Sequence, residues 1–306
     1  MTSPAVTVVI PTRNCLDLLP NAVRSALGQD VQDIEVIVVD DGSTDGTQEW
    51  LADAHSDEPR VRAIALGGVG VQAARMVAIE QARAPLIAFL DADDTWRRGK
   101  LRQQLAFHAA NPDAVLSFTD YLHIDPQGGS HGTCFEFWPR FQARMRNRFD
   151  FVRLGTEARA AILAENVVGT STVIASRDAL LAVGGFDKRL PSASDWDLWL
   201  KLAARGAVGC TGEVLADYLI RPGSMTSNRG RRIAAMRAII QRHGEGVTPS
   251  ARRVARSRLA VAVAEQASAT GRRRVAAMAH LKAFALCPSV RNGRAAARAG
   301  FDALYS

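Results

Sequence analysis

The stretch PLIAFLDADDTW, residues 85–96, joins a short apolar run to a cluster of carboxylates. The apolar half has the composition of a strand buried in a sheet, and Asp91, Asp93 and Asp94 follow it within four positions. Three carboxylates so close together repel one another unless a cation lies among them, and their hard oxygen atoms suit Mg²⁺ or Mn²⁺. The alternative is an acidic cap on a helix that begins at Asp94 or Thr95, because such caps are common where a strand passes into a helix.

This stretch ends the fourth of four apolar runs that alternate with segments of helical pattern. The runs are residues 5–11, 34–41, 61–66 and 85–91, and the helical segments between them are 18–29, 42–54 and 68–82. The alternation predicts an α/β fold of the Rossmann-like kind, with a mostly parallel central sheet flanked by helices. Ligands of such sheets bind beyond the carboxyl ends of the strands, which is where residues 11–14, 40–41 and 91–94 fall.

Composition limits the class of protein. The chain has 306 residues, of which 47% are hydrophobic, so it is long enough for one large domain or two smaller ones with a sizeable core. No apolar run approaches the ~18 to 20 residues of a membrane span, and the N-terminus shows no export signal. The four cysteines, Cys15, Cys134, Cys210 and Cys287, have no metal-ligand spacing. We therefore expect reduced thiols and a cytoplasmic protein.

Charge divides the chain near residue 228. Residues 1–228 contain 22 Lys and Arg and 28 Asp and Glu, a net charge of −6, whereas residues 229–306 contain 16 and 3, a net charge of +13. The basic tail is rich in Ala and Arg, which favour helices, and breaks at 244–246, 271, 288 and 293 predict about four of them. Its first helix carries an apolar stripe of Ile233, Met236, Ile239 and Ile240. The tail is interpreted either as a packed bundle or as a peripheral contact with an anionic membrane.

A second motif, residues 68–73, points to dinucleotide binding rather than to a cation site. GVGVQA, residues 68–73, follows a predicted strand and opens a predicted helix, and Asp91 lies 23 residues after Gly68. This is close to the fingerprint of dinucleotide-binding enzymes, although the motif alone is weak. This motif makes an NAD-type oxidoreductase one candidate function of the chain. A catalytically inactive module that binds a nucleotide-sugar or a carbohydrate is a further alternative to an enzyme that acts on a sugar.

Five stretches taken together resemble the family 2 glycosyltransferases. They are VVIPTRN (8–14), VIVVDDGSTDGT (36–47), GVGVQAAR (68–75), IAFLDADD (87–94) and GGFDKRLPSASDWDLWLKLAARG (184–206). The resemblance covers about residues 5–227 and implies the GT-A fold, with a nucleotide-binding half (1–120), an acceptor half (121–228) and a basic helical tail (229–306). The implied activity is inverting, metal-dependent transfer of a sugar from a nucleotide-diphospho-sugar to an acceptor hydroxyl, in the synthesis of cell-envelope glycans or exopolysaccharides.

The resemblance also assigns the donor site residue by residue. The nucleotide-binding residues it implies are Pro11, Thr12, Arg13, Asn14, Asp41, Arg75, Asp91 and Ala92. Asp41 would accept a hydrogen bond from the base, as suits a carboxylate, and Asp91 would face the ribose. Asp93, the last residue of the D-x-D motif, would bind Mn²⁺ or Mg²⁺ between the two phosphates.

The same resemblance implies that Asp195 is the general base. Its alternative is a helix cap, with Trp196 packed below it. Thr170, Ser171 and Trp196 are candidate acceptor contacts. Arg221 stands where many relatives have His; it cannot ligate a metal, so it either clamps the diphosphate or forms a surface ion pair.

Residues 131–155 mix aromatic side chains with arginines, a combination also found in nucleic-acid-binding segments. We favour a flap over the acceptor site, because loops on α/β scaffolds commonly determine specificity. The predicted partners are the donor, a glycan or lipid-linked acceptor and an anionic membrane, with no nucleic acid. The predicted location is cytoplasmic, peripheral at the inner face of the membrane.

Overall fold

The structure, a computed structural model, describes residues 3–221 and 228–304. The chain divides into two compact units. The larger unit comprises residues 1–156, 167–188 and 197–221, and the smaller unit comprises 157–166, 189–196 and 222–306. The smaller unit thus contains two short segments from the middle of the sequence as well as the basic tail.

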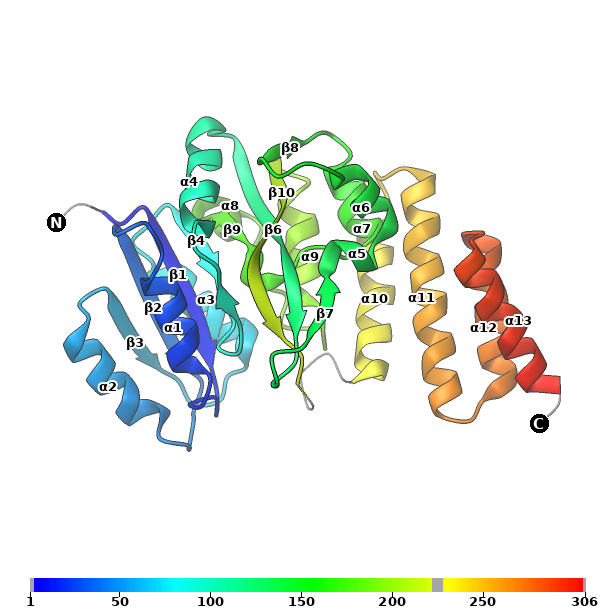
Figure 1. The fold of residues 1–306 in the computed structure, drawn as a ribbon, viewed down its shortest axis with the longest axis horizontal. Helices are drawn as coiled ribbons and strands as arrows, with labels where there is room; N and C mark the ends of the chain where they lie inside the picture. The colour runs from blue at the N-terminus through cyan, green and yellow to red at the C-terminus, as the bar shows by residue number, and fades with distance from the viewer. Residues whose placement is uncertain (1–2, 222–227, 305–306) are drawn as a thin grey trace. The chain divides into compact units, whose positions relative to one another are not determined.

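The larger unit is built on a ten-stranded sheet with the order β3-β2-β1-β4-β9-β6-β10-β5, to which β7 and β8 are added at β6 and β10 (Figure 1). The strands are β1 (Val6–Thr12), β2 (Ile34–Asp40), β3 (Val61–Ala65), β4 (Leu86–Phe89), β5 (Thr95–Trp96), β6 (Ala114–Ile124), β7 (Ser130–Thr133), β8 (Val152–Leu154), β9 (Ile174–Ser176) and β10 (Ala207–Leu219). Pairing among β3, β2, β1 and β4 is parallel, whereas β9 pairs antiparallel with both β4 and β6. The predicted α/β class is confirmed, and the antiparallel pairings all lie beyond β4 in the sheet order.

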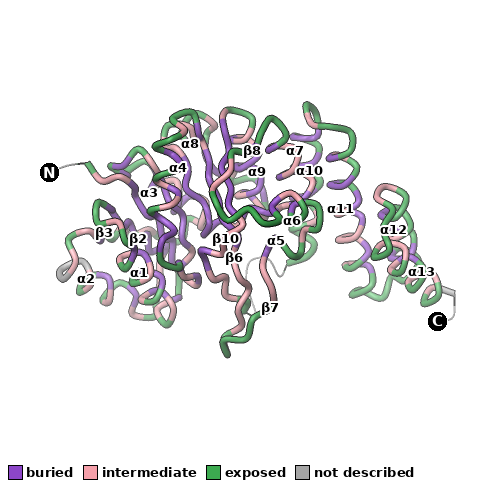
Figure 2. Tube along the Cα trace, turned by 45° about the horizontal axis from the view of Figure 1, so that its top comes forward, coloured by how far each residue is buried: buried purple, intermediate pink, exposed green. Residues whose placement is uncertain are grey.

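Helices of this unit lie on the sheet. They are α1 (Leu19–Leu27), α2 (Thr47–Asp57), α3 (Val71–Gln81), α4 (Lys100–Ala110), α5 (Cys134–Phe137), α6 (Pro139–Met145), the 3₁₀ turn η1 (Thr170–Thr172) and α8 (Arg177–Ala182). Every residue of β1 and β2 is buried, and Figure 2 shows the buried trace running through the central strands. Continuous burial explains why these strands read as unbroken apolar runs rather than as alternating ones.

The segment predicted to be a flap, residues 131–155, contains β7, α5, α6 and β8. Phe135 and Phe141 of this segment are buried, and their rings pack against each other with centroids 4.8 Å apart. Phe118 of β6 contacts both rings. Its aromatic side chains therefore anchor much of this segment to the sheet.

The smaller unit is helical. It contains α7 (Ala158–Ala164), α10 (Arg229–His243), α11 (Pro249–Ala269), α12 (Arg273–Leu286) and α13 (Val290–Leu304); α9 (Ser194–Leu202) starts in this unit and continues into the larger one. Buried alanines, including Ala264, Ala267 and Ala283, allow the neighbouring helices to approach closely. Gly293 lies inside α13, so the predicted break at this residue is wrong.

The apolar stripe of α10 is not a surface feature. Met236, Ile239 and Ile240 are buried and Ile233 is half-buried. This stripe therefore packs within the protein and cannot be the membrane contact that its composition suggested. Among the residues that the structure covers, no helix combines the length and apolarity needed to span a bilayer.

Candidate active site

The parallel strands bring the predicted donor residues to one edge of the sheet. Thr12 ends β1, Asp40 ends β2, and the two are register partners. Asp91 follows β4, which pairs with the other side of β1. Because parallel strands end at the same edge, the loops after β1, β2 and β4 meet there, as the alternating pattern predicted.

Residues 91–94, called the acidic loop below, do not lead into a helix. Thr95 and Trp96 form β5, which pairs with β10, and α4 begins only at Lys100, preceded by Gly99 with a φ of +89°. The alternative of a helix cap at Asp94 or Thr95 is therefore wrong. The sequence could not decide this point, because the strand that holds Thr95 and Trp96 comes from more than 100 residues further along the chain.

Asp94 is the buried member of the acidic cluster. Its carboxylate accepts a hydrogen bond from the hydroxyl of Ser171 and one from the backbone N–H of Leu219 at 3.1 Å. Burial, followed by the charges of Asp91 and Asp93, raises the pKa of Asp94 well above its usual range. These contacts attach the acidic loop to η1 and to the end of β10. Asp94 therefore holds the loop in place and does not face a ligand.

Arg75 pairs with Asp91, as the motif predicted that both would belong to one site. Its guanidinium is buried and forms an ion pair with the Asp91 carboxylate. The guanidinium also lies 5.3 Å from the centroid of the Phe186 ring, and its Nε has no hydrogen-bond partner among the described residues. A buried N–H without an acceptor costs folding free energy. Arg75 is therefore well suited to donate a hydrogen bond from Nε to an oxygen of a bound anion.

Asp93 projects differently from its neighbours. Its side chain is 22% exposed, and its Oδ2 accepts a hydrogen bond from Nε of Arg221 at 2.8 Å. Arg221 thus forms an ion pair, as the surface alternative predicted, but its partner is the predicted metal ligand.

The donor set fits a divalent ion held by one carboxylate. Within 3–221 and 228–304 no group of three His, Cys, Asp or Glu side chains could hold a metal by itself. Asp94 is buried and bound to Ser171 and Leu219, whereas Asp91 pairs with Arg75 and Asp93 pairs with Arg221. A cation at Asp93 would therefore take the place of the Arg221 guanidinium. Mg²⁺ commonly binds through one or two carboxylates together with water and substrate phosphates, so this arrangement fits an ion that arrives with a diphosphate.

Asp41 binds the backbone of residues 67–70, called the glycine-rich loop below. Its two oxygens accept hydrogen bonds from the backbone N–H groups of Val69 and Gly70, each at 2.7 Å. Gly68 and Gly70 have φ of +83° and +91°, a backbone conformation that glycine adopts without strain. In a dinucleotide-binding fold such amides would face a pyrophosphate. Here the Asp41 carboxylate accepts from these amides, so they are not free to bind a pyrophosphate.

The PTRN segment is tied to the loop after β2. Asn14 has a φ of +49°; its backbone N–H donates to Ser43 Oγ at 2.9 Å, and its Oδ1 accepts from the N–H of Thr44 at 2.8 Å. Thr12 is buried, and its hydroxyl has no partner among the described residues. Asn14 therefore joins this segment to the loop after β2, whereas the Thr12 hydroxyl is left for a ligand to bind.

The remaining predicted donor residues are Pro11 in β1, and Arg13 and Ala92 in the loops after β1 and β4. Pro11 and Ala92 are buried, whereas Arg13 is exposed. A Cβ placed on Gly68 would come within 3.6 Å of the Arg13 guanidinium, which therefore lies over the glycine-rich loop. All eight predicted donor residues thus lie in the larger unit: Pro11 and Thr12 at the end of β1, Arg75 in α3, and the others in the loops that follow β1, β2 and β4.

Ser171 has a role that the sequence did not reveal. Besides donating to Asp94, its hydroxyl accepts from the backbone N–H of Asp91 at 3.1 Å, and its carbonyl accepts from Trp96 Nε1 at 2.6 Å. The Nζ of Lys100 lies 4.1 Å from the Trp96 ring, and burial lowers the pKa of Lys100 well below its usual range. Ser171 and its neighbour Thr170 are both buried in η1, and Ser171 supports the acidic loop through these hydrogen bonds.

Asp195 lies in the first turn of α9, as predicted, and is half-buried. Its Oδ1 accepts from the N–H of Trp196 at 2.8 Å. The indole of Trp196 is buried and donates to the carbonyl of Ile162 at 2.8 Å. Asp197, two residues further on, is wholly buried and pairs with Lys201 at 2.9 Å. Of the two carboxylates, Asp195 is therefore the more accessible.

The sequence is similar to glycosyltransferases. A family model described as glycosyl transferase family 2 matches residues 7–164. A Bacillus subtilis protein assigned to teichuronic acid biosynthesis, glycosyltransferase TuaG, is 31% identical over 229 residues, which cover 74% of this chain and 83% of that protein. A chondroitin synthase of Pasteurella multocida is 27% identical over 203 residues, which cover 66% of this chain but 19% of the synthase. The chain thus spans about a fifth of that larger enzyme.

Solved structures share the GT-A fold. The mannosyltransferase PcManGT from Pyrobaculum calidifontis, in complex with GDP-Man and Mn²⁺, superposes with a TM-score of 0.65 at 20% identity, covering all of this chain and 82% of that one. Residues 1–349 of S. aureus TarS in complex with UDP give a TM-score of 0.64 at 17% identity, covering 98% and 92%. With the family match over half the chain, the conclusion is plain: this protein belongs to glycosyltransferase family 2 and is a glycosyltransferase of the GT-A fold.

Proposed function

We propose that this enzyme transfers a sugar from a nucleotide-diphospho-sugar to an acceptor hydroxyl, with inversion and with a divalent cation. The observation that carries the proposal is the acidic loop at the carboxyl edge of the sheet, where Asp91 pairs with Arg75 and the partly exposed Asp93 pairs with Arg221. A carboxylate flanked by cationic groups can hold a metal ion on one side while the arginines meet phosphate oxygens.

Groups left unsatisfied at the edge of the sheet support the binding of a nucleotide. Thr12 Oγ1 and Arg75 Nε are buried without hydrogen-bond partners among the described residues. Asp41 engages two backbone N–H groups, and a carboxylate retains further lone pairs for a base N–H. In this assignment Thr12, Arg13 and Asp41 contact the nucleoside, and Arg75 and Arg221 contact the diphosphate.

The chemistry requires a base on the acceptor side. In the proposed mechanism Asp195 takes the proton of the acceptor hydroxyl while its oxygen attacks the anomeric carbon opposite the leaving diphosphate, so the configuration inverts. The anomeric carbon–oxygen bond to the nucleoside diphosphate breaks in the same step, and Arg75 and Arg221 stabilise the charge that develops. Asp93 would hold a divalent cation, which would offset part of the charge on the leaving diphosphate.

The acceptor class follows from the relatives. The relatives are named for teichuronic acid and chondroitin synthesis, both of which are polysaccharides, so we propose a growing glycan or a lipid-linked glycan as the acceptor. The site of action proposed is the cytoplasmic face of the membrane.

A nucleotide panel tests the donor assignment. We expect UDP, GDP or TDP with Mn²⁺ to raise the melting temperature of the protein, because a ligand at a hundred times its Kd stabilises the folded state by ~2.7 kcal/mol. NAD, with or without metal, should have no effect, because Asp41 occupies the amides of the glycine-rich loop. Stabilisation by NAD and by none of the nucleotide–metal pairs would contradict the proposal.

The tail is proposed to contact an anionic membrane through a face other than the α10 stripe. On α12, Val275, Met278 and Leu281 recur at three-residue steps and are 44%, 72% and 57% exposed. Arginines 272–274 precede them, and residues 229–306 have a net charge of +13. Apolar side chains beside basic ones are typical of helices that lie at a membrane interface.

Co-sedimentation with vesicles measures this contact. We expect binding to anionic vesicles that weakens with salt, since each basic residue at the surface contributes about 1 kcal/mol within a Debye length. Met278→Gln should weaken it further by removing an inserted side chain, whereas Met236→Leu, at a buried position, should not change it. Equal partitioning to neutral and anionic vesicles would argue against the membrane proposal.

A further inference from the structure

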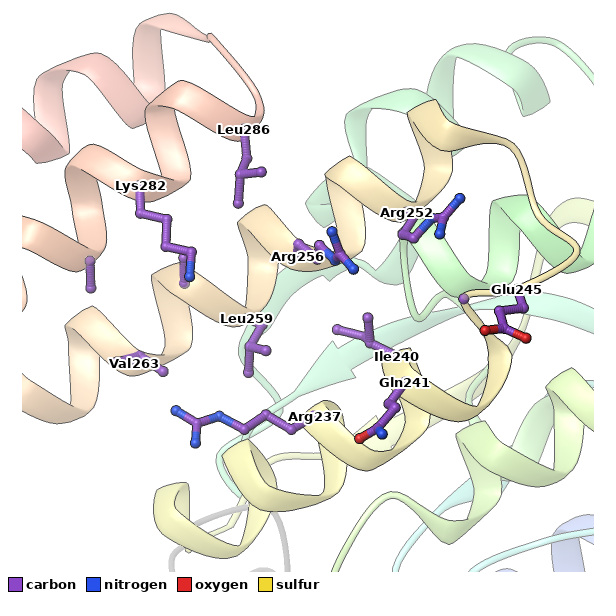
Figure 3. A pocket seen from close by; sticks show the side chains of 13 residues that line it. Arg237, Ile240, Gln241, Glu245, Arg252, Arg256, Leu259, Val263, Lys282 and Leu286 are labelled. Atoms are coloured by element: carbon purple, nitrogen blue, oxygen red, sulfur yellow. The ribbon is translucent and has the colours of Figure 1, made fainter.

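A cleft of about 610 Å³ lies among α10, α11 and α12, wholly within the smaller unit (Figure 3). This volume falls in the ~300 to 1,000 Å³ range that is usual for small-molecule sites. Its floor is apolar and is formed by Ile240, Leu259, Ala260, Val263, Ala279 and Leu286. The cleft is separate from the carboxyl edge of the sheet, because all of its lining residues belong to the tail.

Four cations surround this floor. Figure 3 shows Arg237 on α10, Arg252 and Arg256 on α11, and Lys282 on α12. Glu245 is the one acidic residue among those that line the cleft. In the part of the chain that the structure describes, none of the four cations forms an ion pair within 4.0 Å. The cleft therefore carries an uncompensated net charge of +3.

The apolar floor and the cations around it together indicate what kind of ligand the cleft would bind. Arg237, Arg256 and Lys282 are exposed and Arg252 is half-buried, so water screens part of their mutual repulsion. An anion placed among them would relieve the rest. Arginine recognises phosphate bidentately, and a phosphate monoester carries about −1.5 to −2 charges near neutral pH. A carboxylate would supply only half as much. An alkyl chain attached to the phosphate would cover the apolar floor.

We propose that this cleft binds one molecule of an anionic amphiphile, a phosphate ester that carries an apolar chain. Arg237, Arg256 and Lys282 meet the phosphate, and Leu259 and Val263 contact the chain. The source is either a phospholipid drawn from a bilayer or a free alkyl phosphate ester. The proposal is independent of the transferase mechanism, because none of these residues contributes to the donor site.

Calorimetric titration of the full chain with decyl phosphate, kept below its micellar concentration, tests the proposal. We expect saturable binding of one molecule per chain. The double variant Arg237→Gln/Arg256→Gln should bind at least about tenfold more weakly, because two charge-assisted contacts are lost. The matched control Arg253→Gln/Arg298→Gln removes the same charge from two exposed arginines outside the cleft and should bind as the parent does.

The comparison ligands test the two halves of the site. Inorganic phosphate lacks the chain, and decyltrimethylammonium carries the same chain on a cation, so both should bind much more weakly than decyl phosphate. Val263→Thr, a change of similar shape in the floor, should weaken decyl phosphate but leave inorganic phosphate unchanged. Equal losses in the cleft variant and its matched control, or inorganic phosphate binding as tightly as decyl phosphate, would overturn the proposal.

Vesicles distinguish the two sources of the ligand. If phosphatidic acid vesicles retain the parent and the matched control but lose the cleft variant, the ligand is a bilayer phospholipid. If both double variants sediment alike while decyl phosphate still discriminates between them, the ligand is a free phosphate ester. Stabilisation by nucleotide and Mn²⁺ should persist in the cleft variant, so failure of this proposal and failure of the donor assignment give different results.

Discussion

Asp195→Asn is expected to leave the nucleotide-sugar bound and to lower kcat by ~10²- to 10⁴-fold, the usual cost of removing a general base. The amide keeps the shape of the side chain and can still accept from the N–H of Trp196, but it cannot take a proton at neutral pH. Because the base acts on the acceptor in the transition state, the KM for the donor should change little. Steady-state kinetics at varied donor concentration measures both quantities.

Asp197→Asn is the matched control. Asp197 is wholly buried and pairs with the half-buried Lys201, so its loss should lower the melting temperature, because breaking a largely buried ion pair leaves Lys201 without its partner. Transfer per folded molecule should remain. If a folded Asp197→Asn protein is inactive while Asp195→Asn retains full transfer, the base lies two residues later than proposed. If neither change affects transfer, Asp195 only caps α9.

Asp93→Asn should abolish the metal dependence of nucleotide binding, with an expected loss in Mn²⁺ affinity of at least about 100-fold, since even residues behind the metal ligands cost 10- to 100-fold when changed. The measurement is titration of Mn²⁺ by electron paramagnetic resonance in the presence of the nucleoside diphosphate. The readout is binding, so the result does not depend on turnover.

Two further variants separate ligation from structure. Arg221→Gln breaks the same ion pair from the other side, so it should leave Mn²⁺ bound, with the diphosphate held less tightly. Asp94→Asn keeps only one of the two oxygens that accept from Ser171 and from the N–H of Leu219, so it should lower the melting temperature, but the folded protein should bind Mn²⁺ like the parent. If Arg221→Gln lowers Mn²⁺ affinity as much as Asp93→Asn does, the ion pair matters and Asp93 is not the ligand.

The parallel half of the fold could be predicted from the amino-acid sequence. The runs that form β1, β2, β3 and β4 are locally apolar and are separated by helical patterns, so each element could be inferred from its own residues. Parallel pairing then required their ends, and with them Thr12, Asp41 and Asp91, to meet at one edge. The tail was likewise predicted as several helices because alanine and arginine act locally on the backbone.

Tertiary structure alone decided the roles of side chains whose partners are distant in the sequence. Asp94 looked like a cap until β10 paired with β5 and Leu219, 125 residues away, donated to its carboxylate. Ser171 contacts the acidic loop across about 80 residues, and the α10 stripe is buried while side chains of α12 stay exposed. An amphipathic pattern states that one face of a helix avoids water, but only packing decides what covers that face.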